Sequence, residues 1–331
     1  MRFEELTQLH GVSGYETEVR EAIQKEIEGD VDEIVVDSIG NLIALRKGHG
    51  ERKKRVMLSA HMDEIGFQVI KVLDNGLLMI KTLGHSFLHI AYGSRVRFRN
   101  GMTGVVSSRV PADKLGKDFT DLTVDIGANS KEEALKFVDV GDVACYVGEF
   151  TPLVGRAVLS KAVDDRVGCH MMMEALKRFP RPYHDVYYVF SVQEEVGCRG
   201  AKVAAARIDP EIGIAVDVTP HHDRPGDLEG SNRQGGGIAV KISDTSVICD
   251  ERIVRKMLDL CARESIPCQK EVLYVGGCDA SAINLAGEGI RVGAVSVVTR
   301  YTHGPGCMVD LDDVEAGILL LGAFLGEEID S

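Results

Sequence analysis

Short apolar segments alternate with segments of helical pattern along most of the chain. Four segments are almost continuously apolar and β-prone, at residues 55–59, 186–192, 212–216 and 292–298. Such runs are typical of strands that are covered on both faces of a sheet. Helical segments separate several of them, at 15–28, 165–178, 252–264 and 312–325. This alternation predicts an α/β fold with a mainly parallel central sheet that is flanked by helices.

Two of these helices begin with the spacing of a capping box. Ser13 stands three residues before Glu16, ahead of the helix at 15–28. Glu315 is placed to complete a second capping box at the start of the helix at 312–325. We therefore expect Ser13 and Glu315 to satisfy free backbone groups at these helix starts.

The middle of the chain has a different pattern. Asn75-Gly76 and Asn100-Gly101 each lie between β-prone runs, which is the strongest short-range signal for a hairpin. Residues 143–147 add another strand. We infer a small, mainly antiparallel β domain at 66–159, inserted into a discontinuous α/β domain formed by residues 1–65 and 160–331.

Charge and composition exclude several classes of protein. The formal net charge of −13 over 331 residues disfavours nucleic acid and anionic membranes as partners. The apolar runs are too short to span a bilayer, and the N-terminus lacks a signal-peptide pattern. The eight cysteines are scattered and include no Cys-x-x-Cys pair. A cytoplasmic protein with reduced thiols is the expectation.

Side chains that ligate metals follow the predicted strands with unusual regularity. These residues are His61 and Asp63 after the first strand, Glu194 and Glu195 after the second, Asp217 after the third and His303 just beyond the last. Open α/β sheets bind ligands outside the carboxyl ends of their strands. Asp164 and Asp165 lie at the start of a helix, where Asp164 can face the same edge. So many carboxylates in one cleft require cations to neutralise them, which predicts a divalent-metal site.

The motifs that contain these residues resemble the tetrahedral aminopeptidase family, which includes glutamyl aminopeptidases and proteins labelled cellulase M. The resemblance covers essentially the whole chain, from GVSGY at 11–15 and DSIGN at 37–41 onward. Its most specific parts are HMDEIG at 61–66, KAVDDRVGC at 161–169, QEEVGCRG at 193–200, VDV at 216–218 and YTH at 301–303. In this order and combination the motifs are highly specific.

The resemblance implies a set of roles for these residues. Asp164 would bridge two divalent metal ions, with His61 and Asp217 on one ion and Glu195 and His303 on the other. The two catalytic residues implied are Glu194 and Asp63: Glu194 as the general base, and Asp63 as the carboxylate that orients His61. Zinc or cobalt suits the mixed ligand set, and manganese also suits its oxygen ligands.

The implied activity is that of a metal-dependent aminopeptidase. Water activated by the two metals would release N-terminal residues from short peptides. The resemblance also implies that residues 1–65 and 160–331 form the catalytic domain and that the inserted domain at 66–159 is a small β-barrel. The inserted domain, which contains none of the implied site residues, would supply subunit contacts that build dimers and then a dodecamer. The sequence does not indicate the preferred N-terminal residue, the native metal or the physiological peptides.

Some positions depart from the family pattern. Gly304 and Cys307 stand where the family has Ser and Glu, Cys278 stands where it has Thr, and the stretch 235–237 lacks an expected Gly-Pro pair. These loops shape the pocket, so specificity is open. Cys169, Cys198 and Cys307 flank the metal motifs, but the implied His and carboxylate set is complete without a thiolate.

Three other functions remain as alternatives. A metal-dependent deacylase or carboxypeptidase of the same architecture would use the same activated water. A glycosidase, suggested only by labels within the family, would need paired carboxylates and no metal. A non-catalytic scaffold would have no use for a free base such as Glu194 beside a complete ligand set.

Overall fold

The structure, a computed structural model, describes residues 1–111, 119–225 and 229–329. Four parallel strands form the centre of its large sheet. Their order is β12 (Asp185–Ser191), β3 (Arg55–His61), β13 (Ile212–Pro220) and β16 (Arg291–Arg300). They coincide with the four apolar runs, and their side chains are buried on both faces of the sheet over most of their length. The predicted parallel sheet is confirmed at its centre.

The flanks of the large sheet are antiparallel. On one side lie β2 (Leu42–Arg46) and β1 (Glu33–Val36); on the other lie β17 (Cys307–Asp310), β11 (Ala157–Ser160) and β10 (Thr151–Pro152). A further strand, β14 (Ile238–Ser243), pairs antiparallel with β16 and parallel with β15 (Cys268–Val272). The short link between β16 and β17 has no room for the crossover that parallel pairing needs.

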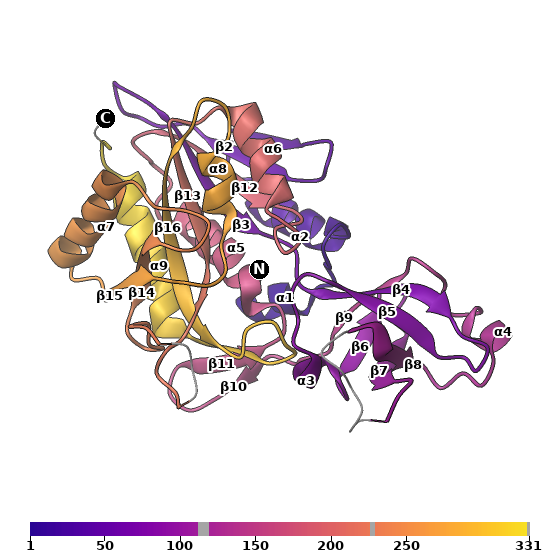
Figure 1. The fold of residues 1–331 in the computed structure, drawn as a ribbon. Coiled ribbons are helices and arrows are strands. Elements are labelled where there is room, and N and C mark those ends of the chain that lie inside the picture. The colour runs from indigo at the N-terminus through magenta and orange to yellow at the C-terminus, as the bar shows by residue number, and fades with distance from the viewer. Residues whose placement is uncertain (112–118, 226–228, 330–331) are drawn as a thin grey trace.

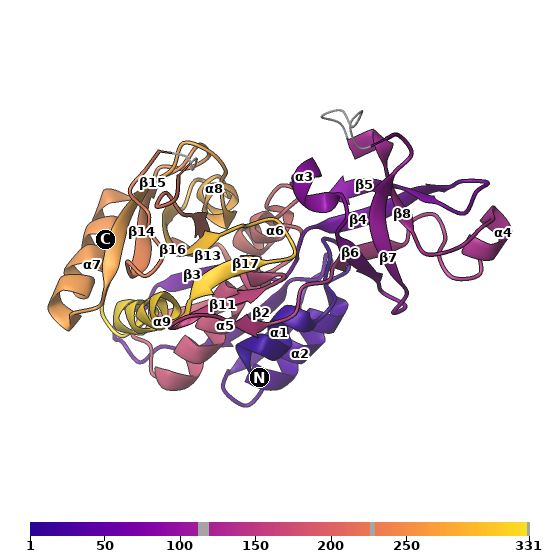
Figure 2. The same ribbon diagram turned by 90° about the horizontal axis from the view of Figure 1, so that it is seen from below.

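Helices cover both faces of this sheet (Figure 2). One face carries α5 (Val163–Arg178) and α9 (Leu311–Leu325), and the other carries α6 (Arg199–Ile208) and α8 (Asp279–Asn284). The described α/β part also contains α1 (Phe3–Gln8), which packs on α5, α2 (Thr17–Ile27), and α7 (Glu251–Glu264), which packs on α9. In the described part of the chain, no helix combines the length and apolarity needed to cross a bilayer.

A separate closed barrel projects from one end of the α/β layers (Figure 1). Around the barrel the strands run β4 (Gly66–Val72), β5 (Leu78–Leu83), β8 (Leu122–Asp125), β7 (Thr103–Ser108), β6 (Arg95–Phe98) and β9 (Val143–Tyr146). Two short helices, α3 (Leu88–Ala91) and α4 (Lys131–Ala134), and a 3-10 turn at Phe119–Asp121 connect them. The barrel has its own apolar core, and both Asn-Gly hairpins occur as predicted.

Neither predicted capping box forms. The hydroxyl of Ser13 donates to Oδ2 of Asp63 at 2.6 Å, and the N-cap of α2 is Glu16. At α9 the N-cap is Asp310, whose side chain accepts from the backbone of the helix, while Glu315 forms an ion pair with an arginine of α5. Both side chains instead bind partners far along the chain, which a local sequence pattern does not contain.

Candidate metal centre

Residues near the carboxyl ends of the parallel strands converge in one place. His61 is the last residue of β3, Glu194 and Glu195 follow β12, and His303 follows β16. Asp217 differs from the expectation, because it lies inside β13 and not beyond its end. Asp217 nevertheless belongs to the same group. The pairing of β13 with β3 stops at Ala215, before Asp217, while β13 continues beside β16.

Asp164 lies between the two imidazoles. Its Oδ1 is 3.1 Å from Nε2 of His61, and its Oδ2 is 3.3 Å from Nε2 of His303. Asp164 and Asp165 are joined by a cis peptide bond and have non-helical backbone angles ahead of the regular turns of α5. One carboxylate therefore faces both halves of the cluster, with one oxygen for each half.

The other carboxylates divide between the two halves. Oδ1 of Asp217 is 3.9 Å from Nε2 of His61, and Oε2 of Glu195 is 3.5 Å from Nε2 of His303. Oε2 of Glu194 lies 3.8 Å from the same atom of His61. At this centre, two groups of three residues offer ligand atoms that lie within 4.8 Å of one another inside each group. The groups are His61, Asp164 and Glu195, and His61, Asp165 and Asp217.

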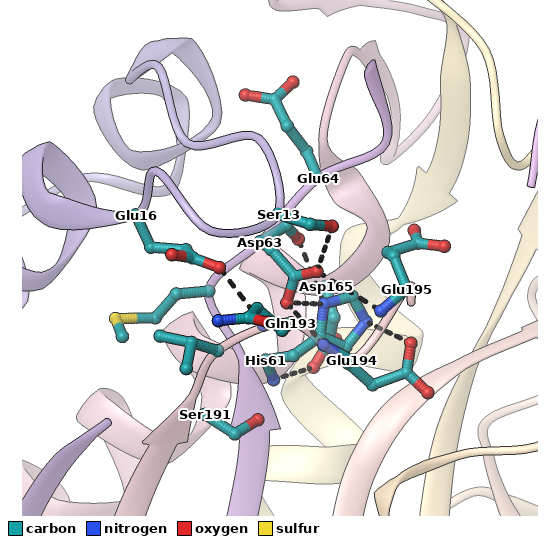
Figure 3. A network of polar contacts seen from close by, with 12 residues as sticks. Ser13, Glu16, His61, Asp63, Glu64, Asp165, Ser191, Gln193, Glu194 and Glu195 are labelled. Carbon is teal, nitrogen blue, oxygen red and sulfur yellow. Dashed lines mark hydrogen bonds and ion pairs between the residues drawn. The ribbon is translucent and has the colours of Figure 1, made fainter. Parts of the chain in front are cut away.

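Asp63 lies among His61, Glu194 and Glu195 and connects them (Figure 3). Its Oδ1 accepts the backbone N–H of Glu194 at 2.9 Å, and its Oδ2 accepts the N–H of Glu195 at 3.2 Å. The same carboxylate lies 3.5 Å from Nδ1 of His61, which donates at 3.0 Å to the backbone carbonyl of Asp63. Nδ1 of His61 is thus engaged, and Nε2 is directed at Asp164.

Most carboxyl groups of the cluster are harder to ionise than they would be in water. Burial and the neighbouring carboxylates raise the pKa of Glu194 and of Glu195 well above the ordinary value. Burial, with repulsion from Asp164, raises the pKa of Asp217 to about 7. Asp164 is the exception: burial alone would raise its pKa, but its contacts with His303 and His61 lower it. A cation inside the cluster would relieve this repulsion.

The donor set fits divalent metal ions. Two imidazole nitrogens and several carboxylate oxygens converge, which is the mixture that zinc, cobalt and manganese accept. Oε1 of Glu195 is buried, and within the described residues it has no hydrogen-bond partner. A buried carboxylate oxygen without a donor is costly, so it is suited to bind a cation.

Two residues at the centre were not assigned roles from the sequence. Asp165 accepts the backbone N–H of His61 at 3.2 Å and of Gly168 at 2.9 Å, and so joins β3 to α5. Glu64 is buried beside Lys161, whose Nζ donates to both of its carboxylate oxygens at 2.8 and 2.9 Å. Both residues stand in the quoted motifs, but only their partners in space reveal these contacts.

The barrel also reaches the centre. A Cβ added to Gly84, between β5 and α3, would lie 3.1 Å from Cβ of Glu195 and 3.2 Å from its Oε2. The ring of His85 is 5.8 Å from that of His303, measured between centroids. Tyr146, from β9, lines a small cavity together with Asp164, Glu195 and His303. The sequence signalled none of these three barrel residues.

Two of the departures from the family pattern line the same cavity. Gly304 and Cys307 contribute to its wall beside His303. Cys278 is buried elsewhere, at the start of α8, where its Sγ lies 3.8 Å from Oδ2 of Asp244. The departures at 304 and 307 therefore alter the surroundings of the centre directly, whereas the one at 278 acts on the packing behind it.

Comparisons with known proteins agree in sequence and in fold. A profile of the M42 glutamyl aminopeptidase family matches residues 40–320. A putative aminopeptidase of Acetivibrio thermocellus is 45% identical over 95% of this chain and 94% of its own length. The solved aminopeptidase APDkam598 of Desulfurococcus kamchatkensis superimposes with a TM-score of 0.94 at 35% identity, over 99% of this chain and 94% of that chain.

A second solved structure is that of a peptidase that can form shells. The TET1 peptidase of Pyrococcus horikoshii, which can assemble into a tetrahedron or a large octahedral shell, matches with a TM-score of 0.87 at 34% identity, over 98% of each chain. These matches extend across both the α/β layers and the barrel. Agreement over nearly the full length, in sequence and in fold together, makes this chain a member of the M42 glutamyl aminopeptidase family.

Proposed function

We propose that this protein is an aminopeptidase that removes N-terminal residues from short peptides with two divalent cations held in the cluster. The position of Asp164 is the observation that carries the proposal. Its two oxygens face His61 and His303 separately, at 3.1 and 3.3 Å. A carboxylate placed in this way suits two cations that share one ligand.

Each half of the cluster has the side chains to hold one ion. His61 and Asp217 would complete one set, and Glu195 and His303 the other, with Asp164 common to both. Asp63 would orient His61 and hold the backbone of Glu194 and Glu195. When bound, the cations would lower the pKa of a water molecule and would provide positive charge beside the scissile carbonyl.

Glu194 has the position of a general base. Its Oε2 is near His61, whereas its backbone is fixed by Asp63, so the side chain stands beside the ligands without being needed by either set. A free carboxylate in this position can first accept a proton and then donate it. Glu194 would take a proton from the attacking water and return it to the departing amine.

Selection for a free N-terminus follows from the charge of the site. The α-ammonium group of a peptide is positive, and it would bind near an acidic side chain or a cation at the edge of the cluster. This contact holds the first peptide bond, and no later bond, beside Glu194. The cavity walls at Gly304 and Cys307 would then influence which first residue is accepted.

The decisive test compares substrate classes on one purified preparation. Aminoacyl para-nitroanilides should be hydrolysed, activity should disappear with a chelator, and zinc, cobalt or manganese should restore it. Hydrolysis of N-acyl amino acids alone would point to a deacylase. Cleavage of glycosides that resists the chelator would contradict a metal-dependent peptidase altogether.

We further propose that the inserted domain mediates assembly into a homo-oligomer, a dodecamer built from dimers. The described barrel residues expose several large apolar side chains, among them Phe137 and Val140, which are 49% and 59% exposed. Exposed apolar side chains of this size suit contacts with another subunit. The shells formed by the Pyrococcus horikoshii relative support this proposal.

A further inference from the structure

A second group of potential ligands lies on the far side of Glu194 from His61. Ligand atoms of Glu194, Cys198 and Asp279 all lie within 4.8 Å of one another. The Sγ of Cys198, at the start of α6, donates to Oε1 of Glu194 at 3.1 Å. The other oxygen of Glu194, Oε2, is the one near His61. The two oxygens of this carboxylate therefore face different neighbours.

Asp279 is prepared to accept a cation. It is 2% exposed, and its Oδ2 accepts the hydroxyls of Ser59 and Ser191, both at 2.7 Å. Those two contacts fix the carboxylate at the start of α8. Its Oδ1 is buried and, across the residues that the structure describes, has no hydrogen-bond partner. Such an oxygen has lost its hydration without gaining a partner. A cation among the three side chains would compensate this loss.

We propose that Glu194, Cys198 and Asp279 form a third metal site, which binds a thiophilic divalent cation such as zinc or cadmium and inhibits the enzyme. A thiolate with two carboxylates and water is a ligand set that zinc accepts in tetrahedral geometry. On binding, Cys198 releases its Sγ–H proton to solvent, and the sulfur and Oε1 of Glu194 each give an electron pair to the ion. No oxidant or reductant is involved.

Inhibition follows from the double use of Glu194. A cation held against Oε1 prevents this carboxylate from taking the proton of the attacking water, while His61 and the other proposed ligands of the two cocatalytic ions stay in place. This consequence rests on the proposed function, in which Glu194 is the base. Metal binding by the three side chains does not rest on it, and it can be measured without a substrate.

The test uses the assembled enzyme with its cocatalytic ions in place and adds cadmium. Cadmium should produce the ultraviolet thiolate-to-metal charge-transfer band, one extra metal equivalent per chain, and loss of activity over the same concentration range. In Cys198→Ser the band should vanish, and half-inhibition should need on the order of tenfold more cadmium. Cys268→Ser is the matched control, because Cys268 is also partly exposed but lies on β15.

Alkylation of the unaltered protein gives a second measurement that needs no variant. Cadmium or zinc should slow the labelling of Cys198 by iodoacetamide, while labelling of Cys268 is unchanged. An unaltered cadmium band in Cys198→Ser would overturn the third site. So would labelling of Cys198 that occurs without metal and is equally fast with metal. A cadmium band that depends on Cys198, in a protein that hydrolyses no peptide, would leave the site standing and remove the proposed function instead.

Discussion

The backbone N–H of Glu194 donates to Oδ1 of Asp63 at 2.9 Å. The residue that we propose as the base is therefore held by a carboxylate that also lies against Nδ1 of His61. Burial alone would raise the pKa of Asp63, but His61 and the donors around it lower that pKa, so Asp63 stays ionised. Movement of Asp63 would disturb the base and a proposed ligand together.

Replacement of Glu194 by Gln separates the base from the ligands. Glu194→Gln should lower turnover by roughly 10²–10⁴-fold, because general-base catalysis contributes about that much. Its metal content should stay near that of the unaltered protein. His303→Ala and Asp217→Ala should lower metal content and activity alike. Elemental analysis checks this, and loss of one metal equivalent in Glu194→Gln would show that Glu194 and Glu195 have exchanged roles.

Gly84→Ala should impair the centre from the barrel side. Gly84 has φ +81°, and the new Cβ would meet Glu195 at 3.1 Å. Gly93→Ala is the matched control, since its φ is +83° and, in the described residues, nothing lies within 4 Å of its Cβ. The positive φ should cost both variants about 1 kcal/mol of stability. Gly84→Ala should cost more, because its Cβ would also lie 2.7 Å from Cγ2 of Ile65. Only Gly84→Ala should lower metal affinity and kcat/KM, and equal activities would contradict the contact.

Lys161→Met should destabilise the protein strongly. Lys161 and Glu64 are 1% and 3% exposed, so the change leaves a buried carboxylate with less compensation. We expect a loss of about 3 kcal/mol in the free energy of unfolding, the low end for a broken buried pair, because Arg166 still lies 3.4 Å from Glu64. The double variant with Glu64→Gln should lose less. Denaturant titration at a fixed protein concentration measures both losses. Equal losses in the single and the double variant would exclude a coupling between Lys161 and Glu64.

Blocking the N-terminus of a peptide should abolish its hydrolysis. An acetylated peptide loses the charged amine that would place its first peptide bond beside Glu194. Mass spectrometry should show a ladder of products from the free peptide and none from its acetylated twin. A folded protein with the same N-terminal sequence is the control for accessibility. Internal cleavage of the acetylated peptide would refute an exopeptidase.

Light scattering should report a particle many times heavier than the 36.0 kDa chain. Replacing exposed apolar barrel residues, as in Phe137→Ser with Val140→Ser, should shift the particle toward smaller species. Ile248→Ser, at an 80% exposed position outside the barrel, serves as the matched surface control. A fully active monomer of the unaltered chain would rule out a need for assembly.

The sequence was sufficient for much of the architecture. The four central strands, the four predicted helices and both Asn-Gly hairpins occur where their patterns predict them. Such elements depend on local periodicity and turn chemistry, which a linear pattern contains. The antiparallel flanks of the sheet were not foreseen, because the pairing of β2 and β17 depends on which neighbours the chain brings together.

The candidate site, like the fold, was predictable from the sequence only in part. The sequence alone determined which side chains follow the central strands, because parallel strands end at a common edge. Tertiary structure decided that Asp164 turns one oxygen to each imidazole and that Ser13 donates to Asp63 and not to a helix start. It also decided that Gly84 of the barrel leaves no free space for a Cβ beside Glu195. Each of these pairs joins residues 50 or more positions apart, and their distances depend on how strands, helices and barrel pack against one another.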